Sequence, residues 1–233
     1  MSDEEIKSSD LEDVEEIVKS VSSGGFRGYA ARFLNIDRQG DIILPGAFSG
    51  AIKEFMADGG MVLADHQNKT SAVIGTLIDA TEDKNGLMVD VTFSATKSGQ
   101  EVRQLVKEKA VRKMSIAFMA KKPTRIPDAQ IRELWAKYGY IPSESQKKLA
   151  RNGANLISEV AEVLEVSIVP IPANPGAEII AVKSADGPED SAPTPPTGEI
   201  AVAGRLLDFT NVVKRAELAD QILSSVSPNR RQV

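Results

Sequence analysis

Residues 72–94 read AVIGTLIDATEDKNGLMVDVTFS and carry the clearest secondary-structure signal in the chain. Two apolar-rich runs, 72–79 and 87–94, flank the turn-rich segment 82–86, which is typical of a β-hairpin. In the second run apolar residues alternate with more polar ones such as Asp90. A period of two gives a strand one face toward the core and one toward solvent. The pattern therefore predicts antiparallel β structure at the centre of the fold.

Short β-like runs separated by turn residues continue on both sides of this hairpin. Further strands are predicted over 26–35, 42–44, 61–65, 111–120, 156–169 and 178–182. Helices are predicted over 46–58, 97–110, 128–137 and 143–150. We therefore expect a mainly β domain with peripheral helices, in the α+β class.

Composition divides the chain into one domain and appended segments. Residues 1–25 form an acidic N-terminal arm, with eight acidic residues among the first sixteen. The domain is expected over 26–183. Residues 184–200 are rich in Pro, Ser and acidic residues, which is typical of a disordered linker. The tail, 201–233, has apolar spacing that predicts a helix over 205–226.

The segment 121–152 differs from the β framework around it. It holds the two helices predicted over 128–137 and 143–150 and the only tryptophan, Trp135. Eight basic residues stand against three acidic ones. We interpret it as a basic helical insertion in the domain. It lies either near the functional face, as long excursions often do, or at the periphery as a decoration.

Composition also excludes several classes of function. The 233 residues contain no Cys and one His, which excludes disulfides, thiolate nucleophiles, iron–sulfur clusters and His- or Cys-rich metal sites. A carboxylate-only Mg²⁺ or Ca²⁺ site stays open. The net charge of −5 argues against general nucleic-acid binding. No apolar run approaches the ~20 residues that span a bilayer, so we expect no membrane association and a reducing, cytoplasm-like location.

Nucleotide and zinc-protease motifs are missing from the sequence. It has no GxxxxGK[ST] loop, no GxGxxG fingerprint, no HExxH helix and no GxSxG elbow. We therefore predict no cofactor and no metal.

Three polar side chains remain as candidates for chemistry. His66 ends the apolar run 61–65, so its imidazole should lie at the rim of a core where it can accept a proton. Ser115 places a hydroxyl within the apolar run 114–118, and Glu165 interrupts another buried-looking strand. Each also has an ordinary interpretation: a structural histidine, a strand serine bonded to a neighbour, and a solvent-facing carboxylate.

These residues belong to a longer series of motifs in a fixed order. The series comprises Gly28-Tyr29-Ala30, Asp37, Gly40-Asp41, Pro45-Gly46-Ala47-Phe48, His66, Ile74-Gly75, Gly86-Leu87, Met114-Ser115-Ile116-Ala117-Phe118, Leu164-Glu165-Val166-Ser167-Ile168-Val169 and Pro172-Ala173-Asn174-Pro175. It resembles the prohead maturation protease family of tailed bacteriophages, which is related in fold to the herpesvirus assemblins. The resemblance covers about 26–182. It implies a serine endopeptidase on a compact, herpesvirus-protease-like β-barrel.

The resemblance also assigns roles to the three candidates. It implies that Ser115 is the nucleophile, His66 its base and Glu165 the residue that orients the base, in the place where assemblins have a second histidine. Glu162 and Asp65 are weaker candidates for the third role. A base that takes the hydroxyl proton of serine typically accelerates such a reaction by ~10²–10⁴.

The sequence departs from the family pattern at two points. Residues 170–174 read PIPAN where assemblins carry an arginine pair used around the oxyanion, so the resemblance assigns no oxyanion donors. Ala117 stands where many family members have glycine.

The implied function is capsid maturation inside the procapsid, in the host cytoplasm. The expected partners are the major capsid protein with its scaffolding segment, which the enzyme would cleave, and the protease itself through autoproteolysis or as a homo-oligomer. Lys183-Ser184 is the expected self-cleavage point, and the C-terminal helix could dock the enzyme in the shell. The alternatives are a non-enzymatic capsid-assembly scaffold or chaperone on the same fold and, third, a hydrolase of small esters.

Overall fold

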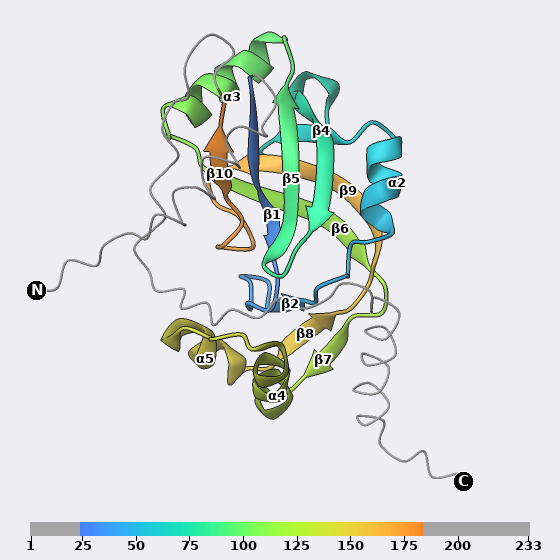
Figure 1. Ribbon diagram of the computed structural model, residues 1–233, viewed down its shortest axis with the longest axis vertical. Coiled ribbons are helices and arrows are strands. Elements are labelled where there is room, and N and C mark those ends of the chain that lie inside the picture. Colours follow the sequence, from blue (N-terminus) through green and yellow to red (C-terminus); the bar gives the residue numbers. More distant parts are fainter. Residues whose placement is uncertain (1–23, 184–233) are drawn as a thin grey trace, which may run out of the picture.

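The structure is a computed structural model that describes residues 24–183 (Figure 1). The linker predicted over 184–200 and the helical tail over 201–233 lie outside the described residues. So does the acidic arm, except for its last two residues.

The described elements follow the predicted order closely. The strands are β1 (Gly25–Arg32), β2 (Asp41–Ile43), β3 (Met61–Ala64), β4 (Val73–Glu82), β5 (Gly86–Phe93), β6 (Lys113–Ala120), β7 (Thr124–Ile126), β8 (Ala154–Ile157), β9 (Val160–Val169) and β10 (Ile179–Val182). The helices are α2 (Ala51–Ala57), α3 (Lys97–Lys107), α4 (Asp128–Tyr138) and α5 (Glu144–Ala150), with a 3₁₀ turn, η1 (Thr70–Ala72). The mainly β, α+β prediction is confirmed.

Seven strands form one curled sheet in the order β10-β1-β5-β4-β3-β9-β6 (Figure 1). The hairpin predicted from residues 72–94 is β4–β5, in which Leu77 lies opposite Val91. Strand β3 pairs antiparallel with β4 and parallel with β9, and β9 pairs antiparallel with β6. The sheet therefore places β3, β9 and β6 side by side at one end of its strand order.

The curl brings the two ends of the sheet together at Gly28. A Cβ on this residue would lie 2.6 Å from the carbonyl oxygen of Glu178 and 2.7 Å from the sulfur of Met114. Only glycine tolerates so close an approach. An isolated bridge between Lys113 and Glu178 joins the start of β6 to the residues before β10. The sheet is thus a half-barrel, closed at this corner.

A smaller sheet of order β2-β8-β7 lies beside α4 and α5, below the large sheet in Figure 1. Ile131, Leu134 and Trp135 of α4 are buried in the same core as the strands. The indole N–H of Trp135 donates a 2.7 Å hydrogen bond to the carbonyl of Leu34. The basic segment 121–152 therefore packs against the domain through α4.

The prediction of a single strand over 156–169 is wrong. The structure has two strands there, β8 and β9, separated by Ser158 and Glu159 and belonging to different sheets. The break consists of only two residues, without the Gly, Pro or Asn that usually marks a turn, so the run was interpreted as continuous. Strand β7, which pairs with β8, was not predicted either. Its three residues lie between Pro123 and Pro127 and are too few to show the alternation of apolar and polar residues typical of a strand.

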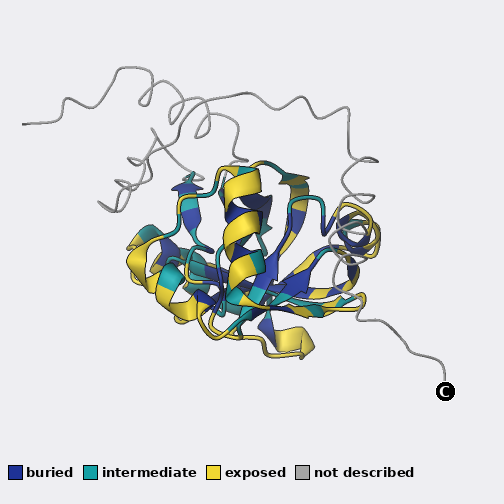
Figure 2. Cartoon of the chain, turned by 90° about the horizontal axis from the view of Figure 1, so that it is seen from below, coloured by how far each residue is buried: buried dark blue, intermediate teal, exposed yellow. Residues whose placement is uncertain are grey.

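Burial follows the layers of the fold. In Figure 2 buried residues line the strands of the interior, and exposed ones cover the outward faces of the helices. Local capping sets the helix ends: the Thr96 hydroxyl accepts from the Gly99 N–H, and α4 stops at Gly139 with φ of 64°. Within residues 24–183, no helix has the length and apolar character needed to cross a bilayer.

Candidate active site

The three predicted residues come from neighbouring strands. Ser115 lies on β6 opposite Ser167 of β9, and Ala117 lies opposite Glu165. Because alternate residues of a strand share a face, Ser115 and Glu165 point to the same side of the sheet. His66 follows the end of β3, which runs parallel to β9 on its other side. The register of three paired strands therefore brings together residues about fifty positions apart in the sequence.

His66 and Glu165 are in direct contact. The imidazole Nδ1 lies 2.5 Å from the carboxylate Oε1. The imidazole is 45% exposed, whereas the carboxylate side chain is only 10% exposed, so the ring can meet a ligand while its partner is held within the protein. A carboxylate can only accept a hydrogen bond, so the neutral ring carries its proton on Nδ1 and leaves Nε2 free as a base.

The backbone at the end of β3 turns sharply to present the imidazole. Asp65 and His66 both have left-handed φ values, 55° and 57°. Such conformations cost about 1–2 kcal/mol for a residue with a side chain, and persist only where the surroundings hold them. Here the Asp65 N–H donates to the Ile168 carbonyl at 3.1 Å, and the His66 N–H donates to the Ser167 hydroxyl at 3.3 Å. Both bonds tie the turn to β9.

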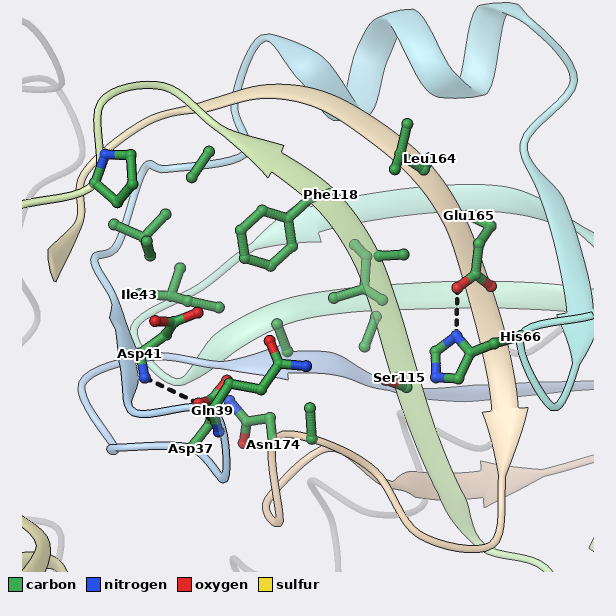
Figure 3. A pocket seen from close by; sticks show the side chains of 18 of the residues that line it. Asp37, Gln39, Asp41, Ile43, His66, Ser115, Phe118, Leu164, Glu165 and Asn174 are labelled. Carbon is green, nitrogen blue, oxygen red and sulfur yellow. Dashed lines mark hydrogen bonds and ion pairs between the residues drawn. The ribbon is translucent and has the colours of Figure 1, made fainter. Parts of the chain in front are cut away.

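Ser115 is buried, with 4% of its surface exposed, and lines the same pocket as His66 and Glu165. Figure 3 shows its side chain next to the imidazole. Within residues 24–183 the Ser115 hydroxyl makes no hydrogen bond, either to His66 or to any other residue. The nearby side-chain hydrogen bonds join Glu165 to His66 and to Ser167. The hydroxyl–base contact of a serine hydrolase commonly forms at full strength only with substrate bound.

The two weaker candidates for the third role do not contact the ring. Glu162 is exposed and lies across from Met119, away from the pocket lining. Asp65 precedes His66, but its carboxylate does not line the pocket. Within residues 24–183, Glu165 is the carboxylate that meets His66.

The pocket around these residues has a volume of about 660 Å³ and continues well beyond them. Figure 3 shows His66, Glu165 and Ser115 at one end and Asp37, Gln39, Asp41 and Asn174 at the other. Apolar side chains also line the pocket, among them Ile43, Met61, Ile116, Phe118 and Leu164. The space is large enough for several side chains of an extended peptide.

The far end of the pocket carries a buried carboxylate, Asp37, which is 8% exposed. Burial raises the pKa of Asp37 above the usual range of an aspartate, and the nearby Asp41 carboxylate adds to the rise. The N–H groups of Asp41 and Gln39 donate to its Oδ1 at 2.9 and 2.8 Å and partly offset the shift. Asp37 therefore shapes its loop and adds negative charge to this end.

Asp37 and Asn174 belong to the motif series above, but neither they nor Ser167 was predicted as part of a site. Asn174 is buried and donates to the Arg32 carbonyl at 2.9 Å, joining its loop to the end of β1. The one sequence signal for Ser167 is a hydroxyl within an otherwise apolar strand. Among the described residues, no group of three or more His, Asp or Glu side chains is placed to hold a metal ion.

Comparison with known proteins identifies the relatives of this chain. It is 30% identical over 168 residues to the prohead protease of Enterobacteria phage HK97. The match covers 71% of this chain and 63% of that protein, so the chain spans less than two thirds of its relative's length. No solved structure matches the chain. The family model of the caudovirus prohead serine proteases matches residues 12–189, which include all three candidate residues. The chain belongs to the family of caudovirus prohead serine proteases.

Proposed function

We propose that this protein is a serine endopeptidase in which Ser115 is the nucleophile, His66 the general base and Glu165 the orienting acid. The observation that carries the proposal is the 2.5 Å contact between His66 Nδ1 and Glu165 Oε1, beside Ser115 in one pocket. Family membership supports the reaction class. A relation to the herpesvirus protease fold stays a prediction.

The reaction follows from these positions in two halves. In the first, Ser115 Oγ attacks the carbonyl carbon of the scissile peptide while His66 Nε2 takes the hydroxyl proton. The resulting imidazolium is stabilised by the Glu165 carboxylate. It then gives its proton to the departing amine nitrogen, so that the C–N bond breaks and an ester to Ser115 remains.

In the second half, water replaces the amine. His66 Nε2 takes a proton from the water molecule as its oxygen attacks the ester carbonyl carbon. The proton then returns to Ser115 Oγ as the ester bond breaks, which releases a carboxylic acid and restores the free enzyme.

An extended peptide can lie along β6. This strand is the last in the order of the large sheet, and the Met114 N–H is already bonded to the Ala177 carbonyl at 3.3 Å. Beyond Ser115, residues 116–120 have no strand partner on their outer side within the described chain. A substrate strand added there would use these free backbone groups and place its scissile bond beside Ser115.

The substrate we propose is the scaffolding segment of the phage major capsid protein, cleaved inside the procapsid in the host cytoplasm. The name prohead protease, given to the HK97 relative, supports this setting. The protease would also cleave itself, at or near Lys183-Ser184. Lys183 follows β10 directly and is the last described residue, so a cut there would spare every described element.

Covalent labelling tests the proposal. A fluorophosphonate probe should add to Ser115 alone among the twenty serines, as peptide mapping would show. Labelling should fall by at least ~10²-fold in His66→Ala, because the hydroxyl then lacks its base. A protein that binds capsid protein but takes no label in either form would instead be an assembly scaffold. A labelled protein that cleaves esters but no capsid protein would be a small-ester hydrolase.

A further inference from the structure

Ser167 lies on β9 two residues after Glu165 and is completely buried, with 0% of its surface exposed. Its hydroxyl makes two hydrogen bonds. It donates to Oε2 of Glu165 and accepts from the backbone N–H of His66 at 3.3 Å. A backbone N–H can only donate, so the one hydroxyl proton must go to the carboxylate. The direction of both bonds is therefore fixed.

The first of these bonds holds the carboxylate in place. Glu165 Oε1 accepts from His66 Nδ1, and Oε2 accepts from Ser167. With both oxygens bonded, the carboxylate cannot rotate without losing a partner. Since Glu165 is only 7% exposed, water cannot readily replace the lost bond, and an unpaired buried oxygen costs about 1–3 kcal/mol.

The second bond holds the backbone of the base. His66 has a left-handed φ of 57°, which needs support from its surroundings. The neighbouring tether, from the Asp65 N–H to the Ile168 carbonyl, uses only main-chain atoms and does not depend on a side chain of β9. The tether at His66 depends on the Ser167 side chain. One hydroxyl thus connects the acid and the base of the proposed triad.

We infer that Ser167 is a positioning residue, which holds Glu165 and His66 as one unit and so keeps the imidazole in the Nδ1–H form with Nε2 toward Ser115. This inference rests on the proposed function. Ser167 does not line the pocket, so it acts through its two partners and not on the substrate.

The first test compares acylation rates. Ser167→Ala should lower the rate of Ser115 phosphonylation at saturating probe by about 10- to 100-fold, because small misplacements of reacting groups cost that much. The probe concentration for half-maximal rate should change little. Ser167→Thr keeps the hydroxyl and should restore most of the rate. A Thr variant that keeps the wild-type imidazole spectrum and is still as slow as the Ala variant would show that the hydroxyl is not what matters.

The second test does not depend on activity. His66 is the only histidine in the chain, so every imidazole signal in a ¹⁵N NMR spectrum belongs to it. Wild type should show a single Nδ1–H tautomer with a low-field proton on Nδ1. In Ser167→Ala the two ring nitrogens should report mixed tautomers and the low-field proton should broaden.

A matched control separates positioning from general loss of stability. Ile74→Val removes one methylene from a fully buried site on β4, a loss of about 0.5–1.5 kcal/mol, without touching His66 or Glu165. It should keep the wild-type rate and spectrum. If it shows the same changes as Ser167→Ala, the effect is one of stability and the inference is wrong.

The remaining outcomes also separate cleanly. If Ser167→Ala does not fold, Ser167→Cys fills the site with a slightly larger and much weaker hydrogen-bonding group and is measured in its place. A folded variant with the wild-type rate and the wild-type imidazole spectrum overturns the inference. Failure of wild-type Ser115 to take the probe overturns the proposed function instead, and the NMR comparison still tests Ser167.

Discussion

The two ends of the pocket are built in different ways. At one end, His66, Ser115 and Glu165 are carried on or directly after three neighbouring strands whose register is fixed by backbone pairing. At the other end, Asp37 and Asn174 lie in loops that are held by side-chain hydrogen bonds. The groups proposed for the chemistry thus rest on the sheet, whereas the groups that face the rest of a peptide rest on turns.

This difference assigns different consequences to mutations at the two ends. Replacing Ser115 or Glu165 should remove turnover and leave the fold intact, because the strands that carry these side chains are paired through backbone atoms. Changes at the loop end should alter stability and substrate binding more than the chemical step, because side chains hold those loops together. The predictions below test this division.

The largest effect is expected for Ser115→Ala. The change should lower peptide cleavage on the order of 10⁶-fold, since no nucleophile remains. The protein should stay folded and full-length, while wild-type preparations are trimmed near Lys183. Intact mass spectrometry and circular dichroism measure both properties. Continued trimming of the variant would show that Ser115 is not the nucleophile. Wild-type trimming far from Lys183 would contradict only the proposed self-cleavage point.

Glu165→Gln should have the next largest effect. The amide keeps the size of the side chain but cannot stabilise the imidazolium, so turnover should fall by about 10²–10⁴-fold with little change in substrate affinity. Glu162→Gln is the matched control, because Glu162 is exposed on the same strand and does not line the pocket. Steady-state cleavage of a capsid-derived peptide compares the two variants. Equal activities would exclude Glu165 from the triad.

Asn174→Ala should act at the loop end. It removes bonds to the Arg32 carbonyl and to the Asn35 side chain, leaving part-buried groups unpaired at a cost of about 1 kcal/mol in unfolding free energy. The rate at saturating substrate should fall less than about tenfold, while KM rises. Urea unfolding and peptide kinetics test this together. If the rate at saturating substrate falls as far as in Glu165→Gln while the protein stays stable, the two ends of the pocket do not differ in the way proposed.

The smallest effect is expected for Asp37→Asn and appears in the pH dependence of stability. Because burial raises the pKa of Asp37, the folded protein binds this proton more tightly than the unfolded chain does. The stability it contributes is fully present below the ordinary value of 3.8 and is lost as the pH rises through the folded pKa. Asn keeps an oxygen for the Gln39 N–H but cannot titrate.

Urea unfolding of wild type and Asp37→Asn, from below pH 3.8 to neutral pH, measures how the free energy of unfolding of each depends on pH. As the pH rises above about 4, the free energy of unfolding should fall less in Asp37→Asn than in wild type, so the variant should become more stable relative to wild type. Parallel curves would show that Asp37 does not titrate differently in the folded protein.

The sequence predicts local elements better than long-range pairings. The β4–β5 hairpin follows from period-two alternation around a turn, and both are local. The division of 156–169 into β8 and β9 depends on β2, which pairs with β8 from more than one hundred residues away. No local pattern records that partner, so one apolar run was mistaken for one strand.

The site shows the same limit. The motif series was enough to select His66, Ser115 and Glu165, and the structure brings these three together. It did not select Ser167, because a serine in a strand is common and its importance depends on where the His66 N–H and the Glu165 carboxylate end up in space. The far end of the pocket was missed for a similar reason, since the motif series includes Asp37 but assigns it no role.

A crystal structure of the phosphonylated protein would test most directly whether these side chains work as one catalytic unit. The account predicts phosphorus bonded to Ser115 Oγ, with His66 Nε2 about 3 Å from the adduct and Nδ1 still on Glu165. An adduct on a different serine, or an imidazole turned away from residue 115 with its carboxylate contact broken, would contradict it.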